Sequence, residues 1–141
     1  MLKNFMDKHS DRFYLAFRVL VGFLFLLHGW MKIGTIMSLD LSNLMFYAGI
    51  IEIVGGIMII LGLFTRWVAI IAAVEMLAAY FKAHAGSALS PLVNKGEPAL
   101  LFFAAFLVLM TQGAKKYSLD NLRTNKKTKF YFFILIIFCP I

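Results

Sequence analysis

Four apolar stretches, each long enough or almost long enough to cross a membrane, constrain the fold of this chain more than any other feature of the sequence. A membrane-spanning helix needs about 20 mainly apolar residues. The first two stretches reach this length, and the last two would either tilt or extend into flanking polar residues. The predicted spans cover residues 13–33, 44–64, 67–82 and 98–112.

The composition agrees with a chain that is surrounded by lipid. The hydrophobic fraction is 62% and the charged fraction is 15%, whereas soluble domains have roughly 45–50% and 25%. Only helices and closed barrels satisfy their backbone polar groups in lipid, and no segment alternates like a barrel strand. The sequence therefore predicts an all-α protein, a transmembrane four-helix bundle in the cytoplasmic membrane.

The basic residues predict the orientation of this bundle, because Lys and Arg gather on the cytoplasmic side of membrane proteins. We expect both termini inside, and the 34–43 and 83–96 loops outside. The basic tail would also contact anionic lipid headgroups, and we do not expect nucleic acid as a partner. The residues that support this orientation are Lys3, Lys8, Arg12, Arg66, Lys115, Lys116, Arg123, Lys126, Lys127 and Lys129.

We divide the chain into a membrane domain, residues 1–122, and a basic tail, residues 123–141. The tail ends in a short apolar segment, Phe130–Cys139, which is half the length of a span and is expected to lie at the interface or against the bundle. Cys139 is the one cysteine of the sequence, so neither an intrachain disulfide nor C-x-x-C chemistry is available.

Ionisable residues within the predicted spans are the candidate functional groups. Each costs about 2.5–3.5 kcal/mol to insert, so it is expected to face the bundle interior and to have a function. Helical periodicity places small residues beside these charges, which allows helices to approach closely. We therefore predict a polar intramembrane pocket that opens outward and contains Arg18, His28, Lys32, Glu52, Glu75 and Glu97.

Each predicted span carries a face on which a charge and small residues lie together. Every such face is expected to be a packing face. The four sets are Arg18, Gly22, Gly29 and Lys32; Glu52 with Gly49, Gly55 and Gly56; Glu75 with Ala72, Ala79 and Lys82; and Glu97 with Ala104, Val108 and Thr111.

Structural roles are open alternatives for the same charges. Arg18 could pair with Glu52 or Glu75 only to fix helix packing. Glu97 suits the start of a helix, where a carboxylate meets the positive end of the dipole. Lys32 could extend to the membrane interface.

The order of these residues resembles the DoxX family of small membrane proteins. The matching strings are RVLVGFLFLLHGWMK (18–32), EIVGGIMIILGLFTR (52–66), NKGEPALLF (94–102) and KYSLD (116–120). The resemblance implies four transmembrane helices and assigns family positions to Arg18, His28, Lys32, Glu52 and Glu97. It also implies a terminal motif at Tyr117, Ser118, Leu119 and Asp120. Glu75 has no counterpart in these strings and rests on its intramembrane position alone.

The same resemblance implies a redox-linked, quinone-associated subunit of an oxidoreductase or oxidative-stress complex. This sequence has no haem, flavin, iron–sulfur or metal-binding motif, so quinone is the one cofactor that we consider. The chain would then need a protein partner, or a second copy of itself, and would not be catalytic alone. A transporter for a small solute or protons and a structural assembly factor are the alternatives. The sequence does not indicate the substrate, the reaction or the oligomeric state.

Overall fold

The computed structural model describes residues 2–88 and 90–124. The regular secondary structure of this part of the chain is all helical, with no strand, so the predicted all-α class is confirmed. The helices are α1 (Leu2–Trp30), α2 (Ile33–Met37), α3 (Leu44–Leu61), α4 (Thr65–Ala79), the π-helical turn η1 (Tyr80–His84) and α5 (Glu97–Gln112).

Three helices in the described residues are long and apolar enough to cross a membrane. They are α1 with 29 residues, α3 with 18, and the continuous segment Thr65–His84 with 20. α5 is apolar but shorter, with 16 residues. α1 begins at Leu2 and not near residue 13, because the polar N-terminal segment continues the same helix. The predicted segment Phe130–Cys139 lies outside the described residues.

Local sequence explains how α3 begins and ends. The Asn43 side chain accepts a hydrogen bond of 3.0 Å from the Met45 N–H and so caps the first turn. Gly62 ends the helix with φ of 67°, a left-handed conformation that glycine adopts at little cost. The chain therefore reverses within residues 62–64, and α4 begins at Thr65.

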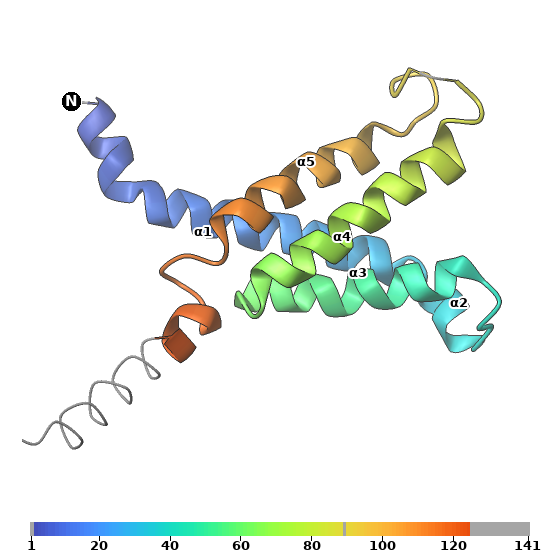
Figure 1. Ribbon diagram of the computed structural model, residues 1–141, viewed down its shortest axis with the longest axis horizontal. Helices are drawn as coiled ribbons and strands as arrows, with labels where there is room; N and C mark the ends of the chain where they lie inside the picture. The colour runs from blue at the N-terminus through green and yellow to red at the C-terminus, as the bar shows by residue number, and fades with distance from the viewer. Residues whose placement is uncertain (1, 89, 125–141) are drawn as a thin grey trace, which may run out of the picture.

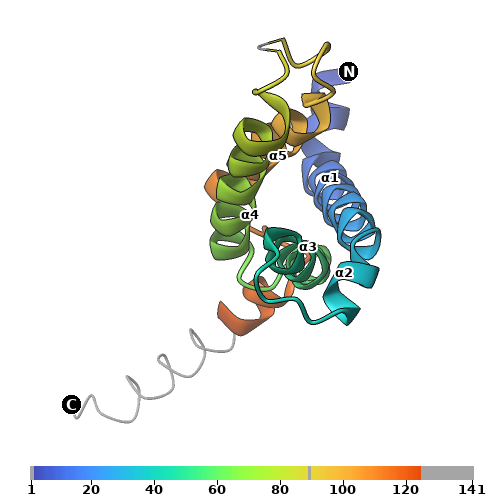
Figure 2. The same cartoon turned by 90° about the vertical axis from the view of Figure 1, so that its right-hand side faces the viewer.

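The helices form two antiparallel pairs that cross. α1 lies beside α3, and α4 lies beside α5 (Figure 1). The view from one end shows the two pairs on opposite sides, with α3 nearest to α4 (Figure 2). Ribbons of the two pairs diverge toward the end that carries α2 and the 85–96 loop. Large apolar side chains remain exposed on the outside, as expected where lipid covers the surface; examples are Phe23, Leu24, Val54, Ile57, Ile71 and Val74.

Glycines bring α1 and α3 into close contact. A Cβ atom at Gly22 would lie 2.9 Å from the Gly56 carbonyl oxygen, and one at Gly56 would lie 2.8 Å from the Gly22 carbonyl oxygen. The predicted packing of glycine faces is therefore confirmed for these two helices. Between the pairs, the fully buried Phe25 contacts Phe106, with ring centroids 4.8 Å apart.

Candidate functional site

The ionisable residues that were predicted to share one pocket lie at separate places in the bundle. Lys32, Glu52 and Glu75 form what we call the intramembrane cluster. Arg18 lies roughly 20 Å away along α1, at a rise of about 1.5 Å per residue. The structure therefore does not bring all six predicted residues into one network.

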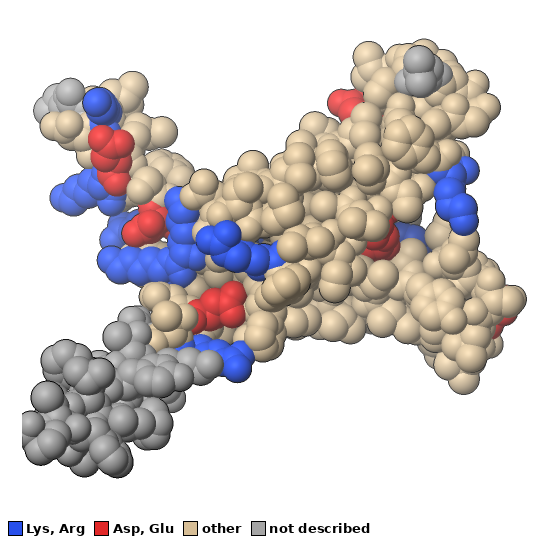
Figure 3. Space-filling view, in the orientation of Figure 1, with Lys and Arg blue, Asp and Glu red and all other residues tan. Residues whose placement is uncertain are grey.

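The centre of the intramembrane cluster is an ion pair between Lys32 and Glu52. Lys32 Nζ donates to Glu52 Oε2. Glu52 is only 2% exposed, whereas the Lys32 side chain is 23% exposed. A buried carboxylate needs such a partner because its desolvation is costly. In Figure 3 an acidic and a basic side chain lie side by side in the hollow between the arm of α4 and α5 and the arm of α2 and α3.

Two glycines make room for this ion pair. A Cβ atom at Gly29 would lie 2.9 Å from the Glu52 Cβ, and one at Gly49 would lie 3.1 Å from the Lys32 Cβ. Both glycines are buried. The pair can therefore form between α1 and α3 only because both helices lack side chains at these points.

Glu75 brings a second carboxyl group to the cluster from α4. Both of its carboxyl oxygens are buried and have no hydrogen-bond partner among the residues that the structure describes. Lys32 and Glu52 both act on it electrostatically. An unpaired buried polar group costs about 1–3 kcal/mol. The position is therefore suited to a ligand that donates a hydrogen bond to the Glu75 carboxyl group, or to a proton that neutralises it.

His28 and Glu97 lie outside the ion pair. The exposed His28 ring contacts Phe102 edge-on, with centroids 5.3 Å apart. Glu97 begins α5 with Pro98 beside it, as predicted for a helix start. However, Glu97 is exposed, and so are the other members of its predicted face, Ala104, Val108 and Thr111. The prediction that this face packs is wrong, because α5 packs through Ala99, Phe106 and Leu109 instead.

Arg18 binds backbone carbonyl groups and not a carboxylate. Its Nη1 donates to the Ala114 oxygen at 2.6 Å, and its Nη2 donates to the Tyr117 oxygen at 2.6 Å and to the Ile60 oxygen at 3.4 Å. Arg18 is 2% exposed. It therefore joins α1 to the end of α3 and to the loop that follows α5, residues 113–118.

The terminal motif holds the beginning of α4. The Asp120 carboxylate accepts hydrogen bonds from the Phe64 N–H at 2.8 Å and the Thr65 N–H at 3.0 Å, and its own N–H donates to the Gly62 oxygen at 2.9 Å. Phe64, at the N-cap position, makes no side-chain cap. Asp120 is therefore the hydrogen-bond acceptor for the first backbone N–H groups of α4, although it lies far from them in the sequence.

The other motif residues support this arrangement. Ser118 Oγ donates to the Lys115 oxygen at 2.7 Å and accepts from the Asn121 N–H at 3.2 Å. Tyr117 contributes its carbonyl oxygen to Arg18, and Leu119 is exposed. The motif assigned by the resemblance therefore joins α1, α3 and α4 at the end of the bundle opposite the intramembrane cluster.

Two residues at this end were not selected from the sequence as site candidates. The Tyr14 hydroxyl donates to the Gly113 oxygen at 2.5 Å, and Arg66 Nη1 donates to the Thr111 oxygen at 2.8 Å. Tyr14 lies one turn before Arg18 on the same helix face, a spacing that could have indicated a shared role. Arg66 was considered only as a charge that sets orientation.

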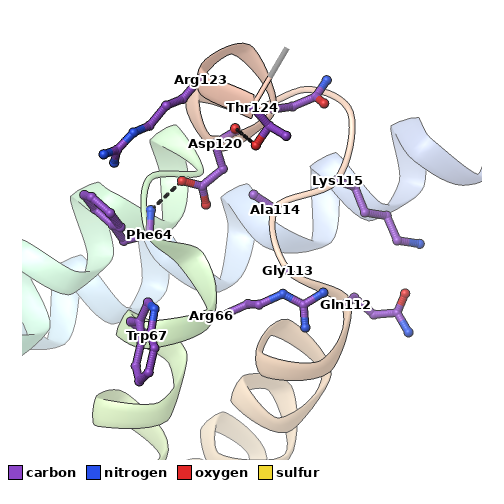
Figure 4. Close-up of a pocket in the computed structure, with 11 residues that line it drawn as sticks. Phe64, Arg66, Trp67, Gln112, Gly113, Ala114, Lys115, Asp120, Arg123 and Thr124 are labelled. Atoms are coloured by element: carbon purple, nitrogen blue, oxygen red, sulfur yellow. Dashed lines mark hydrogen bonds between the residues drawn. The ribbon is translucent and has the colours of Figure 1, made fainter. Parts of the chain in front are cut away.

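A cleft of about 430 Å³ opens beside this junction. Figure 4 shows residues that line it from the start of α4, the loop after α5 and the short helix at residues 119–124. Its lining is Phe64, Arg66, Trp67, Gln112, Gly113, Ala114, Lys115, Asp120, Asn121, Arg123 and Thr124.

In residues 2–88 and 90–124, no group of three or more His, Cys, Asp or Glu side chains could hold a metal ion. The intramembrane cluster itself offers one cationic donor, Lys32, and two carboxyl groups, those of Glu52 and Glu75. This set can bind the polar part of an apolar molecule and can exchange protons with it.

Comparisons with known proteins place the chain in a family. The DoxX family model matches residues 13–85. A Haemophilus influenzae relative, described as an uncharacterized protein, is 40% identical over 128 residues, which cover 84% of this chain and 96% of the relative. No solved structure matches the chain. The family match covers α1 from residue 13, α2, α3, α4 and η1, and with them the Lys32–Glu52 pair. The chain belongs to the DoxX family.

Proposed function

We propose that this DoxX protein is a redox-linked, quinone-associated membrane subunit, with the quinone headgroup bound at the intramembrane cluster. The observation that carries the proposal is the buried Lys32–Glu52 pair beside Glu75, whose carboxyl oxygens have no hydrogen-bond partner in the described residues. Buried ionisable groups without structural partners are expensive in a membrane and are characteristic of functional sites.

The chemistry of a quinone fits this set of groups. A quinone headgroup has two carbonyl oxygens that accept hydrogen bonds, and Lys32 and His28 can donate them. Reduction to the quinol takes up two electrons and two protons. Glu52 and Glu75 can carry the protons, and a partner protein with its own redox centre would supply the electrons. The long apolar tail of a quinone would lie along the exposed apolar side chains of the helices.

Binding of a short-chain quinone analogue to the purified protein tests this proposal. Glu52→Gln and Glu75→Gln should each lower the affinity about tenfold, or about 1.4 kcal/mol. Asp40→Asn is the matched control, because Asp40 is exposed and its carboxylate accepts hydrogen bonds from Ser42, which is also exposed. Unchanged affinity in both glutamate variants would reject the site.

Location and partners complete the proposal. We place the chain in the cytoplasmic membrane as a multi-pass protein with four spans and with both termini inside. The distribution of Lys and Arg supports this orientation; Figure 3 shows these side chains gathered at the end where α1 begins and α5 ends. We expect a redox partner protein or a second copy of the chain, and anionic lipid at the basic tail.

A structural assembly factor is the second candidate, and the contacts of Arg18 favour it. Arg18 is a buried charge whose hydrogen bonds join α1, α3 and the loop after α5, which is a packing role. The two candidates differ in one measurement. A ligand that binds only the folded protein raises its melting temperature, so quinone analogues should stabilise a quinone subunit and should not stabilise a scaffold.

A further inference from the structure

We propose that the cleft beside the start of α4 binds the phosphate group of an anionic phospholipid. The cleft is separate from the intramembrane cluster, so this inference does not rest on the quinone proposal. Three cationic residues, Arg66, Lys115 and Arg123, line it from three different segments (Figure 4).

The charge of the cleft is effectively cationic. Its one acidic residue, Asp120, directs both carboxylate oxygens to the backbone N–H groups of Phe64 and Thr65. In these bonds the negative charge of Asp120 faces the positive end of the α4 dipole and is compensated by it. The three cations have no carboxylate partner among residues 2–88 and 90–124, so they remain available to an anion.

Each cation is held in place by neighbouring groups. Arg66 Nη1 donates to the Met110 and Thr111 carbonyl oxygens at 3.1 and 2.8 Å. Within the described residues its Nη2 and Nε groups make no hydrogen bond, so they can donate to a ligand. The Lys115 ammonium lies 4.5 Å from the centre of the Tyr14 ring. The Arg123 guanidinium lies 5.1 Å from the centre of the Phe64 ring. Fixed guanidinium groups suit phosphate oxygens, because they can bind two at once.

The position of the cleft in the membrane indicates a lipid as the source of the phosphate. The chain reverses between α3 and α4 at residues 62–64, and this reversal lies at one membrane face when both helices span the bilayer. Trp67, on the rim of the cleft, is 70% exposed. Exposed tryptophan beside basic residues is typical of the headgroup layer, so a lipid phosphate would lie at the same depth as the cleft.

Lipid-dependent stabilisation of the full-length protein tests this inference. The protein is purified in neutral detergent, and its melting temperature is measured with added phosphatidylglycerol, with phosphatidylcholine and with inorganic phosphate. Phosphatidylglycerol should raise the melting temperature more than the other two. The double variant Arg66→Gln/Arg123→Gln should need at least tenfold more phosphatidylglycerol for the same stabilisation.

Matched variants separate a specific site from general charge attraction. Lys3→Gln/Lys8→Gln removes the same charge from the exposed beginning of α1 and should respond to phosphatidylglycerol like the wild type. Arg123→Gln alone should also weaken the response, and it spares the Arg66 contacts to α5. Equal effects of the two lipids, an equal loss in the Lys3/Lys8 variant, or equal protection by inorganic phosphate would each overturn the proposal.

Discussion

Gly62 lies where α3 ends, at the point where Arg18 and Ser118 come together. Its φ of 67° is left-handed, and a Cβ atom there would overlap Arg18 Nη1 and would lie 2.5 Å from the Ser118 Cβ. The residue therefore combines a backbone conformation with a close approach, and only glycine satisfies both. Gly62 therefore leaves room for the Arg18 guanidinium, which donates to the carbonyl oxygens of Ile60, Ala114 and Tyr117.

We expect Gly62→Ala to destabilise the protein by more than about 1 kcal/mol, because the substitution adds left-handed strain to a steric overlap. Thermal unfolding in detergent measures this effect. Gly34→Ala is the control, since a Cβ at that position would have no described atom within 4 Å apart from its chain neighbours and its own helix backbone. Equal melting temperatures for the two variants would show that Gly62 is not in close contact with Arg18 and Ser118.

Arg18→Gln should lower the stability by about 1.5–3 kcal/mol, the usual range for hydrogen bonds to a charged group. The shorter amide cannot reach all of the Ala114, Tyr117 and Ile60 oxygens at once. Arg12→Gln, at an exposed position of the same helix, should change the stability little. A loss in Arg18→Gln no larger than in the Arg12 variant, measured by thermal unfolding, would refute the bridging role.

At the scale of elements, α4 depends on a cap that comes from far along the chain. Asp120 accepts from the first amides of the helix, and the residue at its own N-cap position contributes no side-chain acceptor. The α3–α4 connection and the terminal motif therefore form one structural unit.

Asp120→Ala should cost about 0.5–2 kcal/mol, as other losses of an N-cap do. Asp120→Asn keeps one acceptor oxygen and should cost less. Hydrogen exchange at the amides of residues 64–65 reports the loss locally, and it should accelerate there before it does in α5. Asp11→Ala, in the polar first part of α1, is the control; if exchange at residues 64–65 is no faster in Asp120→Ala than in this control, the cap does not exist.

Helical periodicity predicted the faces of α1 and α3 correctly, because glycines and buried charges recur there with the helix period. It could not predict the partners of Arg18. A guanidinium group donates to backbone carbonyl oxygens as well as to carboxylates, and carbonyl groups have no sequence signature. The prediction that the Glu97 face packs was wrong for a related reason. Its other members, Ala104, Val108 and Thr111, are small or apolar, and such residues suit a lipid-facing surface as well as a packing face.

For the whole molecule, the basic end and the intramembrane cluster lie at opposite ends of crossed helix pairs. In the orientation that we propose, residues 83–96 face outward and the beginning of α1 faces the cytoplasm. This orientation would place the proposed lipid cleft at the inner leaflet, and the intramembrane cluster nearer to the outer side.

Labelling with a membrane-impermeant maleimide in intact cells tests the orientation. The natural Cys139 is first replaced by serine. Ser87→Cys should then react from outside, whereas Ser10→Cys should react only after the membrane is made permeable. The reverse pattern would invert the topology and move the proposed lipid cleft to the outer leaflet.

The central claim is that Lys32, Glu52 and Glu75 form a ligand site and do not merely hold helices together. Photolabelling with a photoreactive quinone analogue, followed by mass spectrometry of the labelled peptides, tests this claim most directly. We predict labels on the peptides around these three residues, and their loss when unlabelled quinone is present in excess. Labels spread over the exposed apolar surface and unaffected by that competitor would contradict it.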